Sequence, residues 1–229
     1  MPSRRKPIAN RLLMSLPPAD QSRLAEHMET VSFAFGDVLY EVGDRLNFVY
    51  FPESMLVSKS LVVDDKLPLE IAMVGCDGLV GSSLAMGMAV ASVRVSVRVA
   101  GTAKRMTIEQ FQREFKNSTT FRKAVLCFIH SLMLQVSQTA GCNRFHVVES
   151  RLARWLLMTR DRVGVDEFAL TQEYLAQMLG VRRVGVTHAA QMLKLRKLIS
   201  YSRGRLQIVN GPGLEAAACS CYHKMKQAE

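Results

Sequence analysis

The sequence predicts an α+β protein with three parts: an N-terminal unit of short antiparallel strands, a long central helix, and a C-terminal unit of helices with a small β-hairpin. A change in hydrophobic period along the chain separates the first two. Apolar and polar side chains alternate through residues 31–108, as they do in half-buried strands. From residue 108 the apolar spacing becomes three and four, which is typical of helices. With 229 residues, 48% of them hydrophobic, the chain can bury a core.

Several short strands are expected in the first part. Val31, Phe33 and Phe35 share one face of a strand, and the valines at 93, 95, 97 and 99 share one face of another, opposite Arg94, Ser96 and Arg98. Turn residues recur between such segments, at Gly36-Asp37, Gly43-Asp44, Asp64-Asp65, Asp77-Gly78 and Gly101. This pattern predicts a closed or sandwiched β unit. Residues 9–28 before it read as amphipathic helix, with a second helix starting near Pro18.

The central helix is expected from Thr119 to about Ala140, with Gly141 as a kink or stop. One apolar stripe follows its length, formed by Phe121, Val125, Phe128, Leu132 and Val136. The stripe can pack on the β unit, on a second copy of itself, or on both. A further helix through Leu152 and Trp155 should end near Gly164.

Charge is concentrated in the last third of the chain. The formal net charge is +10; residues 1–150 carry 17 Lys and Arg against 14 Asp and Glu, and residues 151–229 carry 13 against 6. This predicts a polyanionic partner, either nucleic acid or an acidic membrane surface, and the alternative is a generally basic soluble protein. No run of about 18 uninterrupted apolar residues and no apolar stretch after the basic N-terminus occurs. We therefore expect no membrane span or signal peptide, and a cytoplasmic protein.

Residues 170–209 predict a helix-turn-helix followed by a hairpin. Thr171 is placed to cap a helix whose inner stripe is Leu175, Met178 and Leu179, and Gly180 allows the tight turn after it. A second helix is expected from about Arg183 to Leu195, with an inner face formed by Val186, Ala189, Ala190 and Leu193. The segments around Ile199 and Leu206 then alternate on either side of Arg203-Gly204-Arg205.

The outer face of the second helix has the chemistry of a DNA reader. Arginine pairs with guanine and glutamine with adenine in the major groove. The expected base-reading residues are Arg183, Val184, Thr187, His188 and Gln191. The expected phosphate contacts are Thr171, Gln172, Arg182, Lys194, Arg203 and Arg205. Two alternatives remain: a helical hairpin with a solvated basic face, and a small-molecule sensor whose winged helix mediates protein–protein contact.

Other chemistries find little support. The five cysteines, at 76, 127, 142, 219 and 221, form no CxxC pair, which indicates free thiols in a reducing compartment. Cys219 and Cys221 are expected in a helix, where residues two apart point away from each other, so we expect no metal site. The sequence has no GxSxG, P-loop or HExxH and no clustered acid pair. We expect no catalytic residues and no enzyme.

Three stretches together resemble the Crp/Fnr superfamily of bacterial transcription regulators. Leu170–Leu195 with the following Leu198–Arg205 is similar to the family's winged helix-turn-helix, and Gly213–Tyr222 is similar to the tail of one subgroup. Phe35–Asp44 resembles the paired-glycine turns of its cyclic-nucleotide-binding-like β-roll. The resemblance covers roughly residues 10–222.

The resemblance implies an α+β fold with an N-terminal antiparallel, jelly-roll-like β-roll, a long dimerisation helix and a C-terminal winged helix-turn-helix. The corresponding domains would be a sensor domain at 10–118, the helix at 119–144 and the DNA-binding domain at 145–229. It implies a homodimer joined through Phe121, Val125, Phe128, Leu132 and Val136. The implied partners are a palindromic double-stranded DNA operator and RNA polymerase.

The resemblance also defines a candidate effector pocket, formed by Gly81, Ser82, Ser83 and Arg94. Nucleotide-binding members have Gly-Glu where this chain has Gly81-Ser82, and their phosphate-binding arginine falls on Val93. Arg94 is one residue later, on the opposite strand face, so we expect no binding of cyclic AMP in the usual way. No iron–sulfur cluster is expected, because the first cysteine is Cys76. The histidines considered as haem ligands are His27 and His130, and core or surface roles are commoner for lone histidines.

Overall fold

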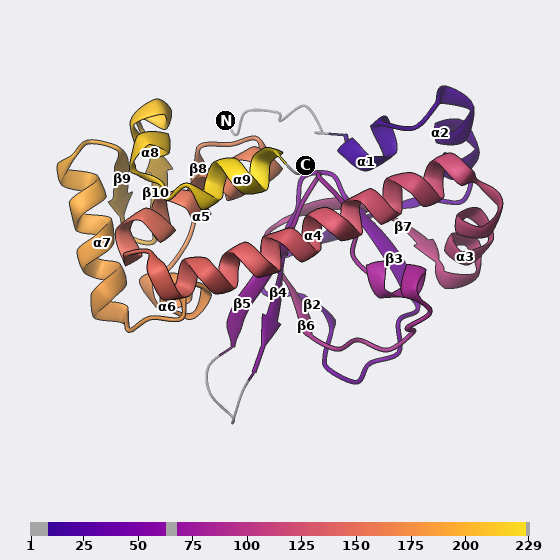
Figure 1. The fold of residues 1–229 in the computed structure, drawn as a ribbon, viewed down its shortest axis with the longest axis horizontal. Coiled ribbons are helices and arrows are strands. Elements are labelled where there is room, and N and C mark those ends of the chain that lie inside the picture. Colours follow the sequence, from indigo (N-terminus) through magenta and orange to yellow (C-terminus); the bar gives the residue numbers. More distant parts are fainter. Residues whose placement is uncertain (1–8, 63–67, 228–229) are drawn as a thin grey trace. The chain divides into compact units, whose positions relative to one another are not determined.

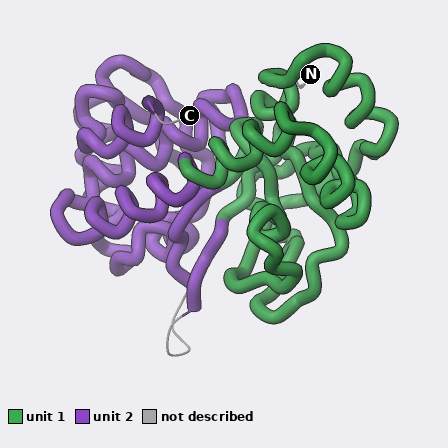
Figure 2. The backbone as a smooth tube through the Cα atoms, turned by 45° about the vertical axis from the view of Figure 1, so that its right-hand side comes forward, with its two compact units in different colours: residues 1–58, 74–130 green, residues 59–73, 131–229 purple. Residues whose placement is uncertain are grey.

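The computed structural model describes residues 9–62 and 68–227, so the turn expected at Asp64-Asp65 lies outside the described part. The chain divides into two compact units, drawn in different colours in Figure 2. The first is formed by the chain up to Ser58 and by Val74–His130. The second is formed by Lys59–Met73 and by the chain from Ser131 onward.

Two short helices open the first unit, and the second of them starts at Pro18 as expected. They are α1 (Arg11–Met14) and α2 (Pro18–Ala25). Asn10 fixes their entry, because its side chain accepts a hydrogen bond from the Leu13 N–H and donates to the carbonyls of Pro52 and Gly78, at 2.9 and 2.8 Å. A buried amide with all these partners stabilises the start of the fold.

The strands form two antiparallel-rich sheets, which confirms the alternating pattern of the sequence. The strands in chain order are β1 (Glu29–Phe33), β2 (Val38–Tyr40), β3 (Phe48–Pro52), β4 (Leu56–Leu61), β5 (Leu69–Val74), β6 (Arg94–Val99) and β7 (Gly101–Thr107). One sheet has the order β1-β7-β3 and the other β2-β6-β4-β5. A 3₁₀ turn, η1 (Ser82–Met86), interrupts the strands, and α3 (Ile108–Asn117) follows them. The N-terminal part is therefore the β unit predicted from the sequence.

The long helix α4 (Thr119–Phe145) runs without a break past Gly141 (Figure 1), so the stop expected at Gly141 was wrong. By length and composition alone α4 could cross a membrane, and one third of its most apolar 18-residue stretch is buried within the chain. The core helix of a soluble protein passes the same test, so a single such helix is weak evidence for a membrane.

The second unit includes the end of β4 and most of β5. Its part after α4 contains the remaining helices and one three-stranded sheet of order β8-β10-β9. Its elements are α5 (Val148–Val163), β8 (Glu167–Ala169), α6 (Gln172–Leu179), α7 (Arg183–Leu195), β9 (Ile199–Ser202), β10 (Arg205–Ile208), α8 (Gly211–Ala217) and α9 (Cys221–Gln227). Helix α5 ends at Gly164, which has φ 66° and ψ 26°, as the sequence predicted. Cys219 lies in the turn before α9 and Cys221 is its first residue, so the expectation that both lie in one helix was wrong.

Candidate nucleic-acid interface

Helix α7 has an apolar inner face and a polar outer face. The inner face is buried and is formed by Val186, Ala189, Ala190 and Leu193, as the sequence predicted. The expected base-reading residues are all exposed, namely Arg183, Val184, Thr187, His188 and Gln191. Because packing occupies one side of the helix completely, the other side is free to enter a groove of DNA.

Helix α6 and the turn after it hold α7 in place. Thr171 caps α6 by accepting a hydrogen bond from the Tyr174 N–H at 3.1 Å. Gly180 ends α6 in the left-handed region, at φ 61° and ψ 40°. The Thr187 hydroxyl donates to Gln172 Oε1 at 2.9 Å, which links the outer face of α7 to the first turn of α6. These features define a helix-turn-helix.

The hairpin of β9 and β10 turns at Arg203 and Gly204, which both have positive φ, at 50° and 75°. Positive φ at both central residues is typical of a type I′ hairpin turn, which favours glycine at the second position. Tyr201 donates its hydroxyl hydrogen to the Leu170 carbonyl at 2.9 Å, and the Leu170 N–H donates to the Gly204 carbonyl at 2.8 Å. The hairpin is thereby fixed to the start of the helix-turn-helix.

An open hollow of about 280 Å³ lies between the first turn of α6, the start of α7 and the hairpin tip. It is lined by Thr171, Gln172, Arg183, Tyr201, Ser202, Arg203 and Gly204. Burial raises the pKa of Tyr201, and the nearby positive charge of Arg183 opposes that rise. An arginine such as Arg203 and the unpaired N–H groups of a helix N-terminus are partners that phosphate prefers.

The remaining cations expected to contact phosphate are all at the surface. Arg182 is the N-cap residue of α7, and Lys194 lies in its last turn. Arg205 lies on β10 and pairs with Glu167 of β8 at 3.0 Å, with 79% of its side chain exposed. This neighbouring carboxylate was not foreseen from the sequence, because β8 was not predicted.

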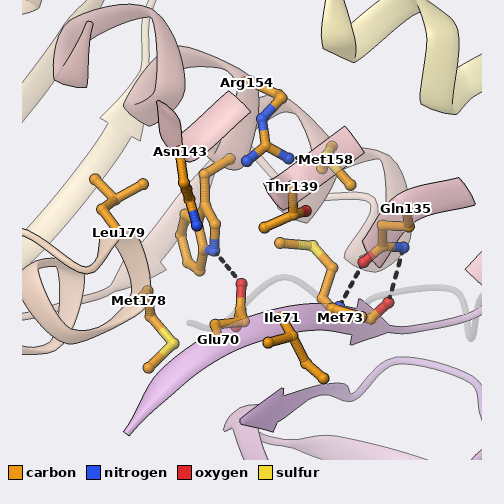
Figure 3. A pocket seen from close by; sticks show the side chains of 12 residues that line it. Glu70, Ile71, Met73, Gln135, Thr139, Asn143, Arg154, Met158, Met178 and Leu179 are labelled. Carbon is orange, nitrogen blue, oxygen red and sulfur yellow. Dashed lines mark hydrogen bonds between the residues drawn. The ribbon is translucent and has the colours of Figure 1, made fainter. Parts of the chain in front are cut away.

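Behind the helix-turn-helix, the second unit encloses a buried polar cluster (Figure 3). The Trp155 indole donates to Glu70 at 2.7 Å, and the Gln135 side chain bonds both the N–H and the carbonyl of Met73. The Arg151 guanidinium donates to the Leu179 carbonyl at the end of α6. The cavity among these groups measures about 10 Å³, which is room for about one water. It serves packing and cannot hold a small-molecule effector.

The residues expected in the dimer interface lie on the buried face of α4. Phe121 and Val125 have no exposed surface, and Phe121 packs against the rings of Phe51 and Phe111 at 6.3 and 5.7 Å between centroids. Phe128 and Leu132 are also buried, and Val136 is half-buried. The assignment of Phe121 and Val125 to a dimer interface is therefore corrected: the chain's own core already covers them.

Leu126 and Met133 of α4 are instead exposed, at 47% and 64%, as is Phe145 at the end of the helix, at 79%. Leu126 and Met133 are seven residues apart, so they share one face of α4, which differs from the face of the predicted stripe. The periodicity of the sequence detects a buried stripe but does not tell a helix's own core from a second chain.

The candidate effector residues are placed around η1 and β6. Gly81 precedes η1 with φ 94°, and a Cβ there would lie 3.3 Å from the Phe48 carbonyl, so glycine is required. Ser82 is buried and Ser83 half-buried. Arg94 pairs with Glu41 at 3.1 Å, so its charge already has a partner.

A β-rich unit, a long helix and a helix-turn-helix with a basic hairpin define a class of DNA-binding transcription regulators. Residues 150–217 match the Crp-like helix-turn-helix domain family. For this region, the match supports the Crp/Fnr resemblance that the sequence indicated.

Solved structures share the fold. FixK2 from Bradyrhizobium japonicum has a TM-score of 0.71 at 12% identity, over 84% of this chain and 98% of that one. The c-di-GMP-responsive global regulator CLP of Xanthomonas campestris has a TM-score of 0.67 at 17% identity, over 84% and 99%. A CRP-family transcriptional regulator from Thermus thermophilus has a TM-score of 0.68 at 17% identity, over 82% and 96%. No curated protein sequence matched the chain.

Proposed function

We propose that this protein is a sequence-specific DNA-binding regulator that acts as a homodimer on a palindromic operator. The observation that carries the proposal is the division of α7 into a fully buried apolar face and an exposed face with Arg183, Thr187, His188 and Gln191. The net charge of the chain from residue 151 onward, with 13 Lys and Arg against 6 Asp and Glu, adds the attraction to a polyanion.

Base reading is assigned to the outer face of α7. Arg183 at its first turn would pair with guanine, and Gln191 two turns later with adenine. Thr187 and His188 would add shorter contacts, and Val184 an apolar contact to a thymine methyl. The bond from Thr187 to Gln172 supports this assignment, because it fixes the side chain before DNA arrives.

Phosphate binding is assigned to the hollow beside the hairpin and to the cations around it. Thr171, Gln172 and Arg203 line the hollow. One strand's backbone would pass there, with the first N–H groups of α6 as further donors. The surface residues that would extend this contact are Arg182, Lys194 and Arg205.

Dimerisation is assigned to the exposed side of α4, centred on Leu126 and Met133. Exposed apolar residues at helical spacing favour pairing with the same helix of a second copy. Pairing of two chains would present two recognition helices to half-sites about one turn of DNA apart.

The β unit is proposed as a sensor whose ligand is not cyclic AMP bound in the usual way. Ser82 replaces the carboxylate of nucleotide-binding members, and the Arg94 guanidinium is engaged by Glu41. We further propose a cytoplasmic protein that contacts RNA polymerase, as regulators of this class do.

Selection of fragments from the source genome by the purified full-length protein, followed by footprinting of the best fragment, tests the proposal. We expect a two-fold symmetric footprint with half-site centres about 10 base pairs apart and a steep salt dependence of affinity. If the protein alone selects no fragment, the selection is repeated with cyclic nucleotides and with cell extract. Binding that appears only then shows that an effector is required for DNA binding. Failure of all arms would favour a winged helix that binds protein.

A further inference from the structure

Three of the five cysteines and one histidine meet at the end of α4. Cys142 lies in its last turns, and His146 follows one turn later, with its N–H bonded to the Cys142 carbonyl. Cys219 and Cys221 come from the turn before α9 and its first residue. The four ligand atoms all lie within 4.8 Å of one another, and all four residues belong to the second unit.

The separations suit one tetrahedral ion. With Zn–S near 2.3 Å and Zn–N near 2.05 Å, tetrahedral angles place two sulfurs about 3.8 Å apart and a sulfur and nitrogen about 3.6 Å apart. Cys142 Sγ lies 3.4 Å from Cys219 Sγ, and Cys221 Sγ lies 3.6 Å from His146 Nδ1. Small side-chain rotations are enough to close such a set around zinc. The three cysteines are buried and the histidine is half-buried.

The charges around the cluster give a second, independent argument. Arg154 is buried, and its guanidinium donates to the sulfurs of Met158 and Met225, at 3.2 and 3.5 Å. Among the residues that the structure describes, no carboxylate pairs with Arg154. A buried cation without a counterion is costly. Three thiolates around one divalent ion carry a net charge of −1, which offsets the charge of Arg154.

A disulfide between Cys142 and Cys219 is the competing use of the sulfurs. It would leave Cys221 and His146 without a role and provide no negative charge for Arg154.

We propose that Cys142, His146, Cys219 and Cys221 form a closed, four-ligand zinc site that ties the end of α4 to α9. Binding replaces the thiol protons, which are released to solvent, and involves no oxidation. Cys142 and Cys219 are 77 positions apart, and the segment between them contains the whole winged helix-turn-helix, so the ion closes a loop around the proposed DNA-binding region. Closing so long a loop stabilises the fold by restricting the unfolded chain.

The first test is elemental analysis of the full-length protein, purified under reducing conditions without chelator and then incubated with zinc chloride and dialysed. We expect one zinc per chain, and a lower melting temperature after the zinc is removed with a chelator. Zinc well below one per chain after this treatment would overturn the proposal, as would a Cys142–Cys219 disulfide in the protein as isolated from cells.

Variants then locate the ion. His146→Ala and Cys221→Ser should each weaken zinc binding by more than about 100-fold, because even groups that only orient a ligand are worth 10- to 100-fold. Cys127→Ser is the matched control, since Cys127 is exposed on the same helix and outside the cluster. The His146 side chain is half-buried, so His146→Ala should still fold. If this variant binds zinc as tightly as the wild type, the four-ligand site is excluded.

Cobalt(II) reports the geometry directly. In the reduced wild-type protein it should show the intense visible absorption of a tetrahedral thiolate complex, which Cys142→Ser should weaken or lose. Weak, octahedral-type absorption would overturn the proposal. None of these readouts uses DNA, so they succeed or fail independently of the proposed DNA binding.

Discussion

Two arginines near the interface occupy different surroundings. Arg183 starts the exposed face of α7 and lines the hollow next to the hairpin. Arg205 lies on β10, largely exposed, beside Glu167. A base contact depends on one base pair, whereas a phosphate contact does not depend on sequence. The two arginines should therefore respond differently to the choice of DNA.

Arg183→Ala should weaken binding to the selected operator by about 1–3 kcal/mol, or about 5- to 150-fold, with little loss on random DNA. Arg205→Ala is the comparison: it should weaken both DNAs similarly and lower the salt slope by about one. Fluorescence anisotropy titrations at several salt concentrations measure both. If Arg183→Ala lowers the affinity for the operator and for random DNA equally, Arg183 contacts phosphate and not a base.

Glu167 should restrain DNA binding, because its carboxylate competes with phosphate for Arg205 at 3.0 Å. Glu167→Gln should raise affinity for every DNA sequence by up to about fivefold, since exposed ion pairs are worth about 0.2–1 kcal/mol. In an Arg205→Ala background the same change should have a smaller effect. A double-mutant cycle in the anisotropy assay measures the coupling, and a gain that is independent of Arg205 would refute the competition.

At the scale of elements, the turn between α6 and α7 depends on Gly180. Its φ of 61° is costly for any residue with a Cβ, and the added atom would lie 2.6 Å from the Leu69 side chain. Gly180→Ala should therefore lower the free energy of unfolding by about 1–2 kcal/mol, measured by urea denaturation. It should also weaken operator binding, because the turn sets the position of α7.

Gly185 provides a control of opposite sign for that stability measurement. It lies inside α7, at ordinary helical φ, and a Cβ there would meet no atom within 4 Å. Gly185→Ala should raise the free energy of unfolding by about 0.5–1 kcal/mol, because alanine loses less backbone entropy in a helix. If Gly185→Ala also lowers the free energy of unfolding, the destabilisation by Gly180→Ala does not arise from the positive φ of Gly180.

Elements with strong local determinants could be predicted from the sequence. Helix α7 begins and ends where its apolar spacing and the glycine turn indicated, and Thr171 caps α6 as expected. Strand β8 was missed, because three residues give no alternation and the strand is held by its pairing with β10. The continuation of α4 past Gly141 could not be predicted either, since one glycine costs only about 1 kcal/mol.

The parts of the candidate sites that escaped prediction depend on contacts distant in sequence. Glu167 beside Arg205 requires the β8–β10 pairing. The Cys142 and Cys219 sulfurs meet across 77 residues, and the CxC spacing gives no sign of a partner elsewhere. Likewise, the spacing left open whether Phe121 packs within the chain or on a second copy and the resemblance assigned it to a dimer, whereas the structure buries it against Phe51 and Phe111.

At the scale of the whole molecule, the proposed function requires two chains. One recognition helix contacts one half-site, and linking two half-site contacts raises affinity by about 10²–10⁴-fold. The surface proposed for pairing is the exposed side of α4, where Met133 is 64% exposed. Its exposure means that a charge there costs the single chain little.

Met133→Glu should therefore give a folded monomer, because two like charges would face each other across an apolar interface. Sedimentation velocity should show the change in mass, circular dichroism should stay unchanged, and affinity for the palindromic operator should fall by about 10²–10⁴-fold. Met14→Glu is the matched control, because Met14 is 58% exposed and lies on α1. A Met133→Glu protein that sediments as a dimer would place the interface elsewhere, since the buried stripe of Phe121 and Val125 offers no surface for it.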